Sequence, residues 1–212
     1  MVENEWQSLV EDLRGATFQF GVVTRDSPLH RVEFDSGLTE SEIRTVEAHF
    51  DFRFPADLCA LLQTALPRGP LFPDWRMPES TALADRLAWP FDGIAFDIEH
   101  NVFWLDSWGP RPAALPDALA VARAAVESAP RLIPIFGHRY LPAEPEAAGN
   151  PVFSVYQTDI ICYGVDLRRY LLCEFGRLDF AEATRGKPRR IRFWTDIIDG
   201  DEELPNPALQ RT

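Results

Sequence analysis

Two helical patterns joined by a tight link constrain the fold more than any other feature of the sequence. Thr39 and Glu42 have the Thr-x-x-Glu spacing of a capping box, and Leu38 and Ile43 occupy the two staple positions around it. Pro55 can open the next helix, because its missing N–H falls where no helical hydrogen bond is needed. The apolar positions of the two expected helices are Ile43, Val46 and Phe50, followed by Leu58, Leu61, Leu62 and Ala65.

The N-terminal part of the chain predicts another helix and a strand. Apolar residues recur at helical spacing over residues 5–14, with Asn4 as the expected cap and Gly15 as the stop. A strand is expected from Ala16 onwards. Beyond the two central helices, the stretch LPRGPLFPDWRMP is rich in proline and glycine, which predicts an irregular loop.

The middle of the chain is interpreted as a short helix followed by a β-hairpin. Leu83 and Leu87 have the spacing of a helix face. In the stretch GIAFDIEHNVFWLDSWG, apolar residues occupy the even positions from 94 to 98, and a turn is expected near His100 and Asn101. Strict alternation of this kind predicts a half-buried strand that returns after the turn.

The remaining elements alternate between helices and strands. The expected elements are a helix over Pro116–Ser128, strands at LIPIF, NPVFSVY and DIICYG, a helix through LRRYLL capped by Asp166, and a last helix near Ile191–Ile198. The final stretch DGDEELPNPALQRT is expected to be loose. No repeat or long linker interrupts the order.

Composition narrows the class of protein. The formal net charge is −12, which disfavours direct binding to nucleic acid or to an anionic membrane and would steer a basic protein partner towards the chain. The three cysteines, Cys59, Cys162 and Cys173, form no CxxC pair and predict free thiols in a reducing compartment. No apolar run is long enough to span a membrane, so a soluble, cytoplasmic protein is expected.

Several motifs occur in an order that resembles the SUKH superfamily, also called the Smi-one/Knr-four family. The matching positions of the opening motif are Leu38, Thr39, Glu42, Ile43, Pro55, Asp57, Leu61 and Leu62. Family-like stretches then follow as FPDWR at residues 72–76, FWLDSWGPRP, LIPIFGHRY and GNPVFSVYQTDIICYGVDLRRYL. The resemblance extends from about Leu38 to Trp194.

The resemblance implies a fold class and a domain organisation. The expected fold is α+β, a single domain with a twisted, mostly antiparallel sheet flanked by helices. Residues 38–198 would form the SUKH-like domain, residues 1–37 a helix-strand extension packed on it, and residues 199–212 a loose tail.

The resemblance also implies binding of protein rather than catalysis. Many bacterial members look like immunity proteins that neutralise a cognate toxin, often a nuclease, and fungal members resemble cell-wall and signalling regulators. The expected function is therefore a non-enzymatic immunity protein that occludes a basic toxin, with a regulatory interaction scaffold as the alternative. This step is an analogy between folds.

An acidic run offers the strongest candidate for chemistry. It comprises Asp92, Asp97, Glu99, His100 and Asp106, which as a group could bind a hard metal ion. Asp97 and Glu99 would, however, share the solvent face of the expected hairpin by simple alternation, and this reading is favoured. The sequence contains no G-x-S-x-G, no H-E-x-x-H and no phosphate-binding glycine loop, and no metal or cofactor is expected.

The stretch IPIFGHRYLP places a histidine, an arginine and a tyrosine side by side at the end of an expected strand. His138 is interpreted as a structural or binding residue, and a metal-dependent hydrolase using Asp97, Glu99 and His138 is the least favoured alternative. The basic cluster Arg185, Lys187, Arg189, Arg190 and Arg192 is expected to pair with nearby acids rather than with nucleic acid.

The candidate partner-binding residues lie in three expected loops or turns. They are Trp75, Arg76, Asp97, Glu99, Trp108, Arg111, His138, Arg139 and Tyr140. The binding face is expected at Leu71–Met77, at Tyr140–Asn150 and at the hairpin around Asp97–Trp108. The favoured interpretation of the individual side chains is that each arginine pairs within the chain and that the tryptophans, Trp104 included, belong to the core.

Overall fold

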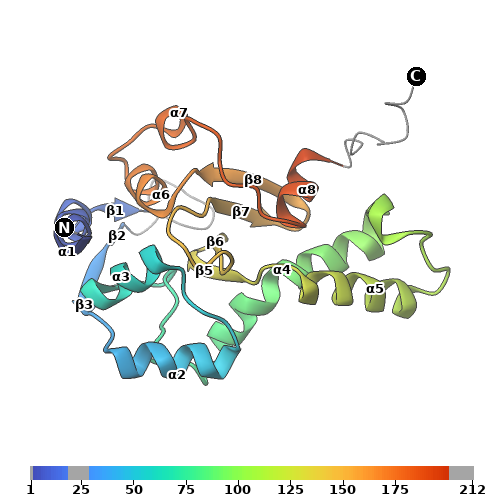
Figure 1. Ribbon diagram of the computed structural model, residues 1–212, viewed down its shortest axis with the longest axis horizontal. Helices are drawn as coiled ribbons and strands as arrows, with labels where there is room; N and C mark the ends of the chain where they lie inside the picture. The colour runs from blue at the N-terminus through green and yellow to red at the C-terminus, as the bar shows by residue number, and fades with distance from the viewer. Residues whose placement is uncertain (1, 19–28, 201–212) are drawn as a thin grey trace.

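The fold is α+β, with eight α-helices and several antiparallel sheets among the described residues (Figure 1). The structure is a computed structural model that describes residues 2–18 and 29–200. No helix in these two ranges is both long and apolar enough to cross a membrane.

The elements of the first half are mostly helical. They are α1 (Val2–Leu13), β1 (Thr17–Phe18), β2 (His30–Arg31), β3 (Glu33–Ser36), α2 (Glu40–Phe50), α3 (Ala56–Thr64), β4 (Ala65–Arg68) and α4 (Thr81–His100). Strand β1 pairs with β2 and β3 pairs with β4, both antiparallel. Helix α1 packs against α3 and against Leu167–Glu174, which form α6. The predicted domain boundaries stay a prediction.

The second half contains the main sheet. Its elements are the 3-10 turn η1 (Asp106–Trp108), α5 (Leu115–Ser128), β5 (Leu132–Phe136), β6 (Arg139–Pro142), β7 (Val152–Tyr156), β8 (Asp159–Gly164), α6 (Leu167–Glu174), α7 (Phe180–Ala183) and α8 (Trp194–Asp199). Strands β5 to β8 pair in chain order as an antiparallel meander. The predicted α+β class and the three predicted strand stretches are confirmed.

The main sheet separates two hydrophobic clusters. Successive strand side chains point to opposite faces, so Ile133 and Leu141 join the cluster with α1, α3 and α6. Leu132 and Tyr140 join the cluster with α4, α5 and α8. Every residue of β5 is buried, as expected for a strand covered by helices on both faces.

The capping box that opens α2 is confirmed by its hydrogen bonds. The backbone N–H of Glu42 donates to Thr39 Oγ1 over 3.2 Å, and the backbone N–H of Thr39 donates to Glu42 Oε2 over 2.7 Å. Leu38 and Ile43 are both buried at the staple positions. Pro55 directly precedes α3, so both predicted helices begin where their local signals place them.

The prediction of an irregular loop directly after α3 is wrong for its first residues. Residues 65–68 form β4, whose Pro67 lies opposite Phe34 of β3. A two-stranded sheet has only edge strands, and an edge strand tolerates a proline that cannot donate to its neighbour. The proline-rich sequence therefore concealed a strand that depends on pairing with residues about thirty positions upstream.

The predicted hairpin around residues 94–108 is wrong. Residues 81–100 form the single helix α4, which continues through Pro90. Ile94 and Ile98 are buried because they lie one helical turn apart on the face that carries Leu83. Short apolar alternation fits both periods, so the pattern of residues 94–98 alone did not distinguish a strand from a helix.

The predicted ends of two helices differ from those in the structure, and two predicted segments lie partly outside the described residues. Helix α1 begins at Val2, so Asn4 lies inside it and is not its cap. The final helix begins at Trp194, three residues after Ile191, and the Phe193 N–H caps its first turn by donating to Asp196 Oδ2 over 2.9 Å. The later part of the strand predicted from Ala16 and the tail beyond Gly200 lie outside the described residues.

Candidate partner-binding surface

Two of the predicted binding residues are buried in the core. Trp75 is 2% exposed and packs edge-to-face against Phe54, with 5.1 Å between ring centroids. Tyr140 is 1% exposed, and its hydroxyl donates to the carbonyl of Arg86 over 2.8 Å. Burial raises the pKa of Tyr140 well above its ordinary value. Neither side chain can anchor a partner without unfolding its surroundings.

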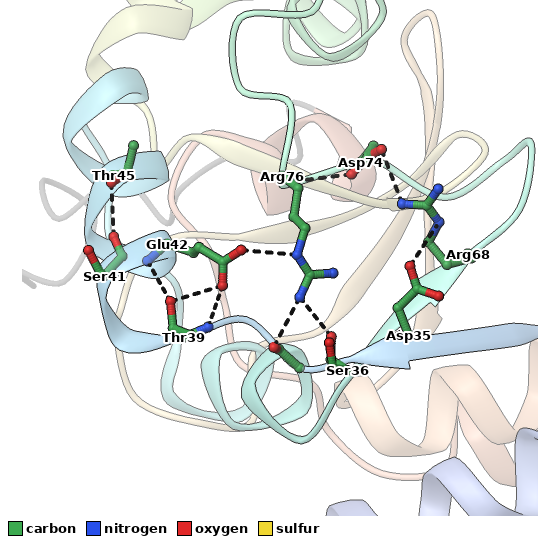
Figure 2. A network of polar contacts seen from close by, with 10 residues as sticks. Asp35, Ser36, Thr39, Ser41, Glu42, Thr45, Arg68, Asp74 and Arg76 are labelled. Carbon is green, nitrogen blue, oxygen red and sulfur yellow. Dashed lines mark hydrogen bonds and ion pairs between the residues drawn. The ribbon is translucent and has the colours of Figure 1, made fainter.

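Arg76 is held by groups of its own chain, as the favoured interpretation expected (Figure 2). Its Nε lies 3.0 Å from Glu42 Oε1, and its Nη2 donates to the carbonyls of Ser36 and Gly37. Hydrogen bonds from Thr39, with a further contribution from Arg76, lower the pKa of Glu42. The capping box of α2 and the loop around residue 76 are thereby joined in one network.

Arg139 belongs to a largely buried ion pair between β6 and α6. Its Nε lies 3.3 Å from Glu174 Oε2, and its guanidinium lies over the Tyr163 ring at 4.0 Å. Burial raises the pKa of Glu174 despite this pair. The neighbouring His138 contacts Arg139, and partial burial of the ring, with the guanidinium adding to it, lowers the pKa of His138.

The predicted hydrolase trio does not form a metal cluster. No group of three or more His, Cys, Asp or Glu side chains within residues 2–18 and 29–200 could hold a metal ion. Asp97 is buried, which corrects its expected place on a solvent face. It accepts hydrogen bonds from the backbone N–H and hydroxyl of Thr158 at 2.9 and 2.6 Å, and from Asn101 at 2.6 Å. Burial would raise the pKa of Asp97, but these hydrogen bonds outweigh it, and the pKa is lowered.

The other predicted residues are dispersed over the surface. Arg111 donates to the carbonyl of Ile98 at 2.6 Å, and Trp108 packs on Trp104 with ring centroids 5.0 Å apart. Glu99 and His138 are exposed but lie on different elements. The nine candidates therefore do not form one surface.

The remaining polar candidates are also engaged or shielded. Arg190 of the basic cluster binds Asp196 and Asp199 at 2.7 and 2.5 Å, as expected. The three cysteines are free and partly buried, and burial raises the pKa of each thiol.

A different surface gathers exposed aromatic and acidic side chains on the outer side of α4. Trp89 and Phe96 are each 44% exposed although both are large and apolar. They are seven residues apart, so they lie in one row along the helix. The exposed carboxylates Asp85, Asp92 and Glu99 repeat at the same interval in a row beside them. We call these five residues, together with Tyr156, the aromatic–acidic face.

The β7–β8 hairpin completes this face and holds it in place. Tyr156 is 57% exposed, and its ring centroid lies 6.4 Å from that of Trp89. The indole N–H of Trp89 donates to the carbonyl of Val155 over 3.1 Å. A Cβ at Gly93 would lie 2.7 Å from the Cα of Gln157, so only glycine permits this close approach of helix and hairpin. Together with the hydrogen bonds of Asp97, these contacts hold this part of α4 against the hairpin.

The sequence contains a signal for this face that the hairpin interpretation obscured. Positions 85, 92 and 99 and positions 89 and 96 follow a seven-residue interval that only a helix turns into rows. In a strand, Trp89 and Phe96 would point to opposite faces.

Comparison of the chain with protein-family models, with curated proteins and with solved structures gives no significant match.

Proposed function

We propose that this chain is a non-enzymatic protein-binding domain of the SUKH superfamily, and that it acts as an immunity protein. It would neutralise a basic toxin by covering the toxin's active surface with the aromatic–acidic face. The single observation that carries the proposal is the pairing of exposed aromatic side chains with a row of exposed carboxylates on one helix.

The chemistry of the face suits a basic protein. Exposed tryptophan and tyrosine side chains supply much of the binding energy in protein interfaces, because they bury large areas with few rotatable bonds. Carboxylates around them attract a positively charged surface and accelerate encounter, and the net charge of −12 acts in the same direction. Because a hydrogen bond to the β7–β8 hairpin already orders Trp89, little of its side-chain entropy remains to be lost on binding.

Affinity capture from extract of the native cell tests the proposed face. The wild-type chain should retain a basic protein that the Trp89→Ala/Phe96→Ala variant loses, because both anchors have been removed. Phe180→Ala is the matched control, since Phe180 is 47% exposed but lies on α7. Capture that is equal for the wild type, the face variant and the control would contradict the proposal.

Co-expression separates neutralisation from recruitment. Expression with the product of each neighbouring gene should identify one toxic product from which the wild-type chain rescues growth and the face variant does not. Rescue that fails with every neighbour, while capture through the face persists, would leave a regulatory scaffold as the function. Metal-dependent turnover abolished by His138→Ala would overturn the non-enzymatic assignment.

A further inference from the structure

A groove of about 1010 Å³ lies beside the acidic row of α4. Its walls are the end of α2 with the link that follows, the middle of α4, and the end of α5 with the start of β5. It reaches the upper end of the size range of sites for small ligands, so it has room for several residues of a peptide.

The four arginines that line the groove are already engaged within the chain. Arg44 pairs with Glu40, Arg53 pairs with Glu47, Arg123 lies over the Phe91 ring at 3.9 Å, and Arg131 donates to the carbonyl of Phe50. These contacts reduce the attraction of the groove for an anion, because each guanidinium would have to give up a partner.

Three carboxylates of the groove are available to a ligand. Asp51, Asp92 and Glu127 have no hydrogen-bond or ion-pair partner among the described residues. Each comes from a different wall: Asp51 from the end of α2, Asp92 from α4 and Glu127 from α5. The lining as a whole carries six carboxylates against four arginines, so its formal charge is negative.

Apolar side chains line the groove together with these carboxylates. They include Leu87 and Phe91 of α4, Val126 of α5 and Phe50 of α2. Apolar walls with carboxylates at their rim fit lysine and arginine, whose long stems pack on apolar surface while their charged ends reach an acid. An apolar side chain would pack on the apolar residues but leave the carboxylates without a partner. A short polar side chain would reach a carboxylate but make little apolar contact.

We infer that this groove binds an extended, lysine- or arginine-rich segment of the protein partner. The inference rests on the proposed function and names the chemistry of the segment. Asp92 belongs both to the aromatic–acidic face and to the lining of the groove, so a partner seated on the face has a direct path into it. A second copy of the chain is a poor occupant, because it carries the same net charge of −12.

A defined probe tests the groove directly on the full chain. The basic probe is a labelled, end-capped seven-residue peptide of alternating lysine and leucine, and the acidic probe has glutamate in place of lysine. Fluorescence anisotropy should show binding of the basic probe that weakens with added salt, and no binding of the acidic probe.

Paired variants locate the binding site. Asp92→Asn/Glu127→Gln should weaken the basic probe roughly fivefold, because two carboxylate contacts are lost. Glu11→Gln/Asp12→Asn is the control that makes the same change in net charge on α1, which contributes no residue to the groove. If the groove variant loses no more affinity for the basic probe than the control does, the inference is overturned. Equal binding of the basic and acidic probes would overturn it as well. Matching unfolding midpoints for the two double variants would exclude loss of fold as the cause.

The test distinguishes failure of the inference from failure of the proposed function. If Trp89→Ala/Phe96→Ala abolishes capture of the partner but the basic probe does not bind, the groove is not a site for basic peptide. The aromatic–acidic face is then still supported as the partner-binding surface. If the basic probe binds in the groove but no partner depends on the face, the proposed function falls and the groove remains a site for basic peptide.

Discussion

Helix α2 is fixed by residues next to it in sequence, whereas the C-terminal half of α4 is fixed by a hairpin 61 residues further along the chain. The capping box of α2 satisfies its first backbone donors within a span of four residues. Helix α4 contains Pro90, which removes a helical hydrogen bond, and Gly93, which has low helix propensity. Its continuation past these two residues depends on contacts with β7 and β8.

The comparison shows that similar lengths of helix can have different physical origins. A local cap contributes about 1 kcal/mol and acts in any context in which the helix forms. A buried carboxylate that accepts several hydrogen bonds contributes more, but only after the fold has brought its donors to it. The same tertiary contacts also create the aromatic–acidic face, so the stability of α4 and the arrangement of its exposed side chains depend on the same residues.

Asp97→Ala should give the largest loss of stability, about 3 kcal/mol in the free energy of unfolding. The substitution removes the acceptor of the Thr158 backbone N–H and hydroxyl and leaves these donors without a partner. Urea denaturation of the variant and the wild type measures the difference. Glu99→Ala, on the exposed side of the same helix, should change stability by less than about 0.5 kcal/mol. A similar loss for both variants would remove the distinction between anchored and exposed acids.

Gly93→Ala should destabilise the protein by about 1–2 kcal/mol, although alanine is the better helix former. The added Cβ would lie 2.7 Å from the Cα of Gln157, so helix and hairpin must separate. The exposed Ala88 is the matched position, where Ala88→Gly should cost about 1 kcal/mol through propensity alone. Stabilisation by Gly93→Ala in thermal unfolding would show that the helix does not depend on this close approach.

Thr39→Ala should cost about 1 kcal/mol, because it removes the side chain that accepts from the Glu42 N–H. The loss should be smaller than that of Asp97→Ala, since the backbone donor of an exposed cap can turn to water. Chemical denaturation of both variants under one condition compares them. A larger loss for Thr39→Ala would reverse the proposed order of local and tertiary contributions.

The smallest expected effect is a dependence of stability on pH through Asp97. Its folded pKa is lower than the ordinary value of 3.8, so its ionised form stabilises the fold at pH values above 3.8. That contribution is lost as the pH falls through the lower folded pKa. The difference in unfolding free energy between wild type and Asp97→Asn should therefore shrink as the pH falls below 3.8. A difference that stays constant over this range would contradict the lowered pKa.

The candidate site was the least predictable part of the molecule. Trp75 and Arg76 stand in a proline-rich stretch that resembles an exposed loop, yet the first packs into the core and the second binds Glu42. Both contacts involve residues far away in the sequence, and the local periodicity of apolar residues carries no information about such contacts. The hairpin interpretation did not reveal the exposed aromatics of α4, because it counted Phe96 among the apolar positions of a strand that began after Trp89.

The sequence by itself determined the elements whose signals are short-range. These include the capped helix α2, the helix that follows Pro55, and the strands β5, β7 and β8 with their alternating or wholly apolar pattern. Only the tertiary structure decided that residues 93–100 continue a helix, because eight residues of alternating pattern fit either period until a partner selects one. The hairpin of β7 and β8 makes that selection through Asp97 and Gly93, and the rows of acidic and aromatic side chains exist as a surface only because it does.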